Sequence, residues 1–211
     1  MSTNTSKLQL KIPAFTDEIE NTIRDLGENF QKLDQISDDF VTDIPVSGDY
    51  LQNATLRNAN CVYGSYYGWV NTRTGKAAPE WESVHSYKNG DYIVPTVDNG
   101  HVYQCIQSGY SGYREPVFPI SEGAEFQDIR ATSQWASTTL YQKNDMVLPS
   151  IDNGRYYICI QAGESGDQEP IWTTIDGTTT YDKNAVWSTH RIAKWKEIGS
   201  AAWFRPFGKI E

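Results

Sequence analysis

The feature that most constrains the fold is an internal repeat. Residues 81–134 and 135–190 align without a gap at an offset of about 54 residues, a period in the range of structural repeats. Roughly a third of the aligned positions are identical, which chance does not easily supply over this length. The sequence therefore predicts one small unit that is built twice.

Each copy has the pattern of a β-hairpin. In the first copy an apolar run precedes Asn99-Gly100, and a second apolar run, residues 102–106, follows it. Asn-Gly between apolar runs favours a type I′ turn, because both central residues of that turn need positive φ. Alternation along the second strand places Tyr103 and Cys105 on one face of the sheet. The same pattern predicts a second hairpin around Asn153-Gly154.

Aromatic residues recur at matching positions of the copies and are the candidate ligand-binding residues. They are Trp81, Tyr87, Tyr103, Trp135, Tyr141, Tyr157 and Trp172. A module of this size has a small core, so aromatic rings are expected to supply much of its stability. The alternative is that some rings lie exposed as flat platforms on which sugar rings stack. The sequence leaves open which rings face outward.

Residues 1–41 are expected to form an extended arm followed by a helix. Leu8, Leu10 and Ile12 alternate with polar residues, as in a short strand that is available for pairing with another subunit. Thr16 is a suitable helix cap, and the acidic pair that follows it suits the positive end of a helix.

The apolar residues of this helix are spaced alternately by four and three, which is the seam pattern of a coiled coil. They are Ile19, Ile23, Leu26, Phe30 and Leu33. A stripe this narrow and short is marginal alone in water and needs a partner. Its partner is either the β-domain of the same chain or the same helix of other copies. The second case gives a symmetric oligomer, and the five residues are then its contacts.

The expected fold is mainly β, with two tandem small antiparallel β-modules preceded by an N-terminal α-helix. Residues 42–80 are interpreted as irregular β structure between the helix and the first module. Residues 191–211, which contain Trp195 and Trp203, are expected to pack back onto a module.

Composition excludes several functions. The net charge of -9 opposes binding to nucleic acid, because that binding depends on basic residues that neutralise phosphates. No apolar run is long enough for membrane insertion, and the N-terminus lacks the layout of a secretion signal, so synthesis in a cytoplasm is expected. Cys61, Cys105 and Cys159 have no close Cys or His companions. We therefore expect no disulfide framework, structural metal or cofactor, and we interpret the two repeated cysteines as small core residues.

Catalysis is not expected. A glycan hydrolase needs two positioned carboxylates, and the only repeated acidic pairs are Asp91 with Glu115 and Asp145 with Glu169. An active site rarely needs a copy in each small module, and a Glu before Pro sits naturally in a turn. Phosphate-binding and nucleophile-elbow motifs are also missing from the sequence. No catalytic residue is assigned.

Each copy resembles the small chitin-binding-like carbohydrate modules that recur in tail and fibre proteins of bacteriophages. The matching residues are the leading Trp, Tyr-x-x-x-Asp, Gly-x-x-Tyr-x-Cys, Ser-Gly-x-x-Glu-Pro and a late Trp, with residues 195–199 similar to the closing strand of that family. The second copy departs from the pattern, because Asn144 stands where the first has Gly90. The segment 12–34 resembles the start of phage tail proteins, in which a short helix attaches the fibre to the virion.

This resemblance implies a virion component, a tail or head fibre, that is made in the cytoplasm of a bacterial host. It implies attachment to other virion proteins through the arm and helix, self-association as a homotrimer, and contact with glycans of the host cell surface. A purely architectural virion protein that binds no sugar is the alternative. A cell-wall glycan hydrolase is the remote alternative.

Overall fold

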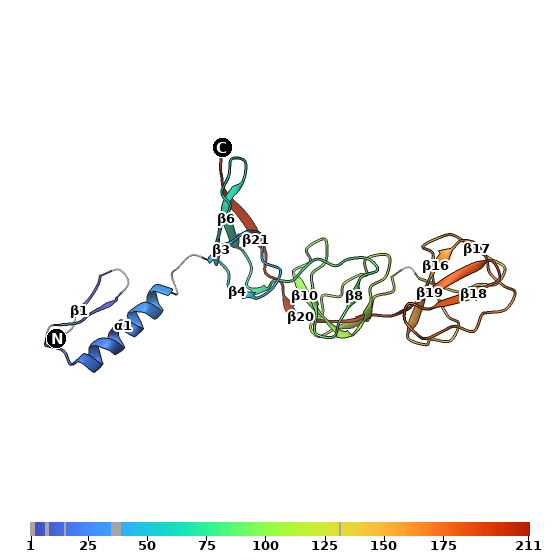
Figure 1. Cartoon of the computed structure of the whole chain (residues 1–211), viewed down its shortest axis with the longest axis horizontal. Helices are drawn as coiled ribbons and strands as arrows, with labels where there is room; N and C mark the ends of the chain where they lie inside the picture. The colour runs from blue at the N-terminus through green and yellow to red at the C-terminus, as the bar shows by residue number, and fades with distance from the viewer. Residues whose placement is uncertain (1–2, 7–8, 15, 35–38, 131) are drawn as a thin grey trace. The chain divides into compact units, whose positions relative to one another are not determined.

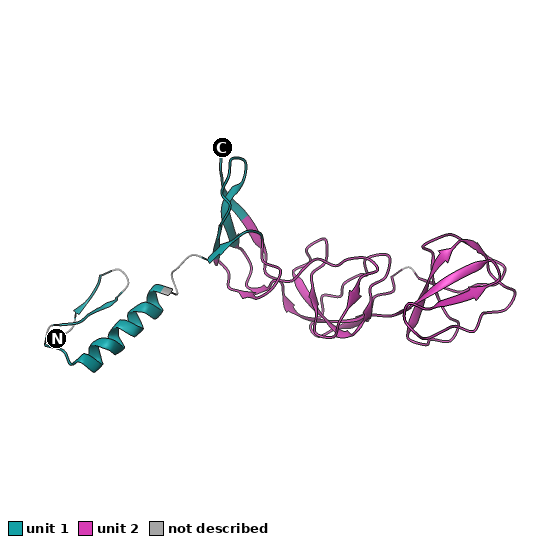
Figure 2. Cartoon of the chain, viewed as in Figure 1, with its two compact units in different colours: residues 1–43, 55–70, 206–211 teal, residues 44–54, 71–205 magenta. Residues whose placement is uncertain are grey.

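A computed structural model of the chain describes residues 3–6, 9–14, 16–34, 39–130 and 132–211. The fold is mainly β, with one N-terminal helix and several small antiparallel or mixed sheets, which confirms the predicted fold class at this level (Figure 1). The chain divides into two compact units (Figure 2). The first comprises residues 1–43, 55–70 and 206–211, and the second comprises residues 44–54 and 71–205.

The first unit contains helix α1 (Ile19–Asp34), a hairpin and a small sheet. The antiparallel hairpin consists of β1 (Thr3–Asn4) and β2 (Lys11–Ile12). Leu8 of the predicted arm lies outside the described residues. The small sheet has the strand order β21-β6-β5-β3, in which β3 runs parallel to β5 and β5 runs antiparallel to β6. Its strands are β3 (Asp39–Val41), β5 (Thr55–Asn58), β6 (Tyr66–Asn71) and β21 (Phe204–Lys209), of which β6 and β21 continue into the second unit.

The second unit holds the two sequence repeats and the short strands β4 (Asp49–Tyr50) and β7 (Gly75–Lys76). The strands of the first repeat are β8 (Ser86–Tyr87), β9 (Tyr92–Ile93), β10 (His101–Gln107), β11 (Gly109–Tyr110) and β12 (Glu125–Gln127). Those of the second are β13 (Ser133–Gln134), β14 (Leu140–Tyr141), β15 (Met146–Leu148), β16 (Arg155–Gln161), β17 (Gly163–Glu164), β18 (Thr179–Asp182) and β19 (Ala185–Arg191). Matching strands pair alike: β8 pairs with β11 and β14 with β17.

The first repeat is closed by a strand from much later in the chain. In the second repeat β16 pairs with β19, which follows β18 through a short turn. In the first repeat the corresponding partner of β10 and β12 is β20 (Lys194–Ser200). The register agrees, because Cys159 lies opposite Trp187 and Cys105 lies opposite Trp195. The second repeat is therefore inserted between β12 and β20 of the first repeat. The first repeat consequently includes β20 in addition to residues 81–134.

A buried carboxylate joins the two ends of the first repeat. Asp128 accepts hydrogen bonds from the indole N–H groups of Trp81 and Trp195, at 2.8 and 3.0 Å. A third bond, of 3.1 Å, comes from the backbone N–H of Gly112. Burial raises the pKa of Asp128, although these donors partly offset the effect.

The second repeat has the same arrangement. Asp182 is buried and accepts from Trp135 and Trp187, at 2.8 and 3.2 Å, and from the backbone N–H of Gly166 at 2.7 Å. We call this arrangement the Trp–Asp–Trp clamp. In both repeats the buried aspartate accepts from the leading tryptophan and from a tryptophan on the closing strand. A glycine from the middle of the repeat donates the third bond.

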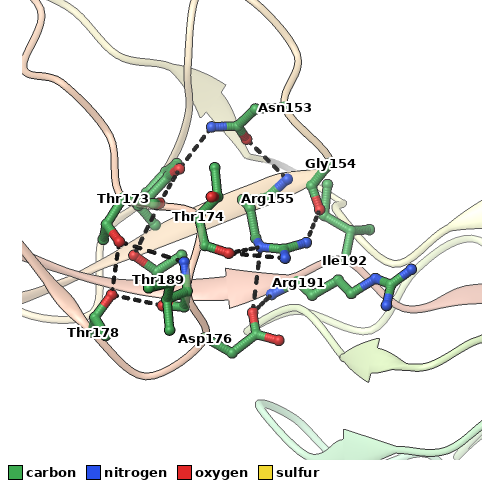
Figure 3. Close-up of polar contacts among 12 residues, drawn as sticks. Asn153, Gly154, Arg155, Thr173, Thr174, Asp176, Thr178, Thr189, Arg191 and Ile192 are labelled. Carbon is green, nitrogen blue, oxygen red and sulfur yellow. Dashed lines mark hydrogen bonds and ion pairs between the residues drawn. The ribbon is translucent and has the colours of Figure 1, made fainter.

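The Asn-Gly turns lie in equivalent environments, but they are not type I′ turns. Of the two residues only the glycine has positive φ, with 91° at Gly100 and 71° at Gly154. The reason is loop length, because residues 94–100 separate β9 from β10, which is more than a two-residue hairpin allows. Asn153 instead bonds within its own loop, accepting from the N–H of Arg155 at 3.0 Å (Figure 3).

Each repeat has its own aromatic core. The buried residues of the first are Trp81, Tyr87, Ile93, Tyr103, Cys105, Ala193 and Trp195. Those of the second are Tyr141, Val147, Tyr157, Cys159, Ala185 and Trp187. Tyr103 and Cys105 share a core as the alternation predicted, but Val102 on the other face is buried as well.

Because the second repeat is inserted in the first, we expect unfolding of the second repeat to destabilise the first, but not the reverse. Asp182→Ala removes the acceptor of the buried Trp187 indole N–H and of the partly buried Trp135 indole N–H, and a buried unsatisfied group costs about 1–3 kcal/mol. When the second repeat opens, the first must close over a long flexible loop, which costs on the order of 3 kcal/mol in chain entropy. We expect Asp182→Ala to lower hydrogen-exchange protection in both repeats, and Asp128→Ala to lower it in the first alone. Asp167→Ala, at an exposed position, is the control. Loss of protection in the second repeat of Asp128→Ala would contradict this coupling.

A second buried carboxylate links the closing strand β20 to the rest of the first repeat. Glu197 lies 2.8 Å from His101 Nδ1 and accepts from the backbone N–H groups of Gly123 and Gly199 at 2.9 and 2.7 Å. Burial alone would raise the pKa of Glu197, but these hydrogen bonds outweigh burial and hold the pKa below its ordinary value.

This lowered pKa predicts an acid-sensitive contribution to stability. Ionised Glu197 stabilises the fold above its unfolded pKa, and the contribution is lost as the pH falls through the lower folded value. We expect Glu197→Gln to be less stable than the parent at pH 7, with a difference that shrinks below the ordinary glutamate pKa of 4.5. Urea midpoints measured at several pH values test this. A difference that stays constant down to acid pH would show that Glu197 ionisation is not involved.

Candidate functional site

Helix α1 has a polar face that is covered by the hairpin of the same unit. The backbone N–H of Lys11 donates to Asn29 Oδ1 at 2.8 Å, and Asn29 Nδ2 donates back to the Lys11 carbonyl at 2.7 Å. Lys11 Nζ also bridges Asp25 and Glu28, at 2.8 and 2.9 Å. Asp25 and Asn29 are consequently buried, although both are polar. The hairpin therefore satisfies the polar face and leaves the apolar stripe uncovered.

The apolar stripe of α1 is exposed, and we call it the α1 stripe. Its side chains are between 39% and 80% exposed: Ile19, Ile23, Leu26, Phe30 and Leu33. At 100° per residue these five fall on one side of the helix, on a different face from Asp25 and Glu28. Within its own unit the stripe is not covered by the hairpin, which binds a different face of the helix. Exposed apolar side chains in this number mark an interaction surface.

The helix begins later than the sequence indicated. It starts at Ile19, and Thr16 lies ahead of it without capping its first turn. The carboxylate of Asp17 instead accepts from the backbone N–H of Ala14 at 2.7 Å. The Asp17 side chain therefore bonds to the backbone ahead of the helix, as Asp side chains often do outside helices.

Five of the seven predicted ligand-binding rings lie in the cores. They are Trp81, Tyr87, Tyr103, Tyr141 and Tyr157. None of them has a face open to a sugar ring, so the stacking hypothesis no longer applies to them. The other two, Trp135 and Trp172, are partly buried and pack against the core of the second repeat.

The polar ends of the buried tyrosines are also occupied. Tyr103 Oη accepts from Asn99 at 2.8 Å and donates to the carbonyl of Pro119 at 2.9 Å. Its counterpart Tyr157 makes the same two contacts. These hydroxyl groups therefore bond to loops of their own repeat, and their only proton is already donated to a backbone carbonyl.

A surface of exposed aliphatic residues, which was not predicted from the sequence, occurs in both repeats. The pairs are Val97 with Val117 and Ile151 with Ile171, all between 73% and 98% exposed. They occupy matching positions, before the Asp-Asn-Gly turn and after Glu-Pro. Next to Val97 a shallow hollow of about 220 Å³ is lined by Glu115 and Phe118. The sequence signal for this surface is an apolar residue that recurs in both copies next to the turn residues. We call these positions the aliphatic pairs.

The repeated carboxylates serve the turns. Glu115 accepts from the backbone N–H of Thr96 at 2.8 Å and also from its hydroxyl. Glu169 makes the same contacts to Ser150 and accepts from the Trp172 indole at 2.6 Å. Burial would raise the pKa of Glu169, but these bonds outweigh burial and lower the pKa. A glycosidase general acid needs a raised pKa, so this carboxyl is poorly suited to that role.

The described part of the chain holds neither a cluster of metal-ligand side chains nor a membrane-spanning helix. Its His, Cys, Asp and Glu side chains form no group of three or more that could hold a metal ion. Within the same residues no helix is long and apolar enough to cross a membrane.

Comparisons with models of known protein families, with curated proteins and with solved structures gave no match for this chain.

The three cysteines differ sharply in environment, which predicts their reactivity. Cys61 is exposed, whereas Cys105 and Cys159 are buried. Burial raises the pKa of the Cys105 thiol to about 11 and also raises that of Cys159. We expect a thiol-specific chromogenic disulfide to titrate one cysteine in the native protein and all three in denaturant. Rapid labelling of a repeat cysteine under native conditions would contradict the burial of that cysteine.

Proposed function

We propose that the chain is a non-enzymatic structural protein of a bacteriophage virion, a tail or head fibre or a related appendage. Helix α1 joins copies of the chain into a homotrimer and, with the arm, attaches them to other virion proteins. The repeats are two copies of one duplicated β-module and present a surface to glycans of the host cell.

The observation that carries this proposal is the exposed α1 stripe. The polar face of the helix is already bound by the hairpin, so assembly through this helix must use the apolar face. The alternating spacing of four and three suits knobs-into-holes packing against a like helix. The resemblance to phage fibres, rather than the stripe itself, motivates the number three.

Duplication of the module is supported by paired contacts. The Trp–Asp–Trp clamp, the Asn-Gly loop and the carboxylate bonds of Glu115 and Glu169 recur at equivalent residues. Linked copies of a weak binding site gain avidity without any new contact, which favours adhesion as the role of the pair.

A purely architectural role is the second candidate, and the burial of the predicted rings favours it. With five of the seven rings in the cores, the aliphatic pairs are the repeated apolar surface that remains. Such a surface also suits contact with another protein subunit.

Self-association is tested by measuring the mass of the full chain in solution. We expect the parent to sediment at three times the chain mass, and the double variant Ile23→Glu/Phe30→Glu to sediment as a monomer, because charges on the seam cannot be buried. Gln31→Glu adds a charge elsewhere on the same helix and should leave the trimer intact. A monomeric parent at assay concentration would overturn the assembly role of α1.

Adhesion is tested by co-sedimentation with purified bacterial cell walls. If the repeats bind glycans through the aliphatic pairs, Val97→Asp/Val117→Asp and Ile151→Asp/Ile171→Asp each weaken retention, and together they weaken it more than the sum, since avidity is lost. Leu140→Asp, at an exposed position outside the pairs, is the matched control. Absence of retention of the parent protein selects the architectural candidate.

A further inference from the structure

Some residues outside the two repeats make, among themselves, the same set of contacts that the two repeats share. In each repeat a tyrosine on the first short strand pairs with a glycine just after the long strand, and the same antiparallel pair joins β4 to β7. The pairs are Tyr50 with Gly75, Tyr87 with Gly109 and Tyr141 with Gly163. At each glycine an added Cβ would lie within 2.6 Å of backbone atoms, so all three positions exclude a side chain.

The turn after the tyrosine is shared as well. Three residues on, the backbone has positive φ, with values of 70° at Asn53, 97° at Gly90 and 77° at Asn144. The N–H of each donates to a carbonyl of the following long strand. The acceptors are Asn71, Cys105 and Cys159, at 2.7, 2.8 and 2.8 Å.

The closing strands complete the correspondence. An edge-to-face ring contact joins each tyrosine to its closing strand: Tyr50 to Phe204 at 5.0 Å, Tyr87 to Trp195 at 4.8 Å and Tyr141 to Trp187 at 4.8 Å. Residues 44–54, 71–77 and 201–204 of the second unit thus form a third, divergent copy. The first repeat is inserted into it, as the second is inserted into the first.

The third copy lacks the Trp–Asp–Trp clamp. Ile44 stands at the position of Trp81, and Phe204, which has no N–H, stands at the position of the second tryptophan. From Ala77 the chain continues directly into the first repeat, so the segment that carries the aspartate has no counterpart.

A cavity of about 390 Å³ lies where the clamp is missing. Its apolar lining includes Ile44, Ala77, Ala78, Val94, Ala202 and Phe204. Glu80 and Asp98 also line it. Asp98 is paired with Arg73 at 2.7 Å, whereas the Glu80 carboxylate has no hydrogen-bond or ion-pair partner among the described residues. The cavity therefore combines an apolar interior with one available acceptor, and its size is that of a small-ligand site.

We propose that this cavity binds an aromatic side chain, specifically an indole, of a partner polypeptide. Both repeats fill the equivalent position with the indole of Trp81 or Trp135, whose N–H donates to a buried carboxylate. In the third copy a ring supplied by the partner takes the place of the missing tryptophan, and Glu80 accepts its N–H. This inference does not depend on the proposed function.

The test uses the full chain and N-acetyltryptophanamide, followed by ligand-observed NMR. We expect saturable binding that is at least tenfold weaker in Ile44→Trp, because the chain then fills the cavity with its own ring. Ala78→Leu, which narrows the lining, should have the same effect and provides a second variant if the first folds poorly. Ile151→Trp, at an exposed position of the second repeat, should bind as the parent does.

Three outcomes with the amino-acid amide probes would overturn the proposal. They are the absence of saturable binding to the parent protein, unchanged affinity in both cavity variants, and binding of N-acetylleucinamide as tight as that of the indole probe. Tighter binding of N-acetylglucosamine at this site would overturn it too, because the occupant would then be a sugar. Glu80→Gln weakens the indole probe if its carboxylate accepts the N–H, and leaves N-acetylleucinamide unchanged.

Discussion

A carboxylate shared by two indole N–H groups closes each repeat, and most of the module depends on it. Burying a carboxylate is costly unless its oxygens are hydrogen-bonded. Asp128 and Asp182 each receive three donors, from two tryptophans and one glycine N–H. The three donors come from the start, the middle and the end of each repeat, so the bonds fix the ends of the segment together around a small aromatic core. This explains why modules with so few strands hold fully buried tryptophans.

The order of strands along the chain follows from the same closure. The final strands β19, β20 and β21 complete the second repeat, the first repeat and the third copy in that order. The innermost module is therefore the most local in sequence, and each outer one adds a contact of greater sequence separation, which slows folding. The inferred third copy has neither the aspartate nor the two tryptophans of the clamp, and a buried indole N–H without an acceptor would be destabilising there.

The surfaces left for partners are those that internal contacts do not use. The hairpin binds the polar face of α1 through Lys11 and Asn29, and so the α1 stripe stays exposed. In the repeats the tyrosine hydroxyls and the glutamates are engaged by their own loops, which leaves the aliphatic pairs. The proposed assembly and adhesion thus rest on apolar contact, and the proposed indole site adds one acceptor, the Glu80 carboxylate, to an apolar lining.

Local and repeated features could be predicted from the sequence: the mainly β fold, the N-terminal helix, and the burial of Cys105 and Cys159. Periodicity fixes these, because side-chain direction follows from spacing along one element. The turn type at Asn99-Gly100, the burial of five candidate ligand-binding rings and the aliphatic pairs depend on contacts between distant segments, which the sequence pattern does not specify. It alone showed the insertion of one copy in another, because β20 is far in sequence from the strands that it joins. The inferred third copy has little sequence likeness to the repeats, since most of its shared contacts are made by backbone atoms, which many side chains permit.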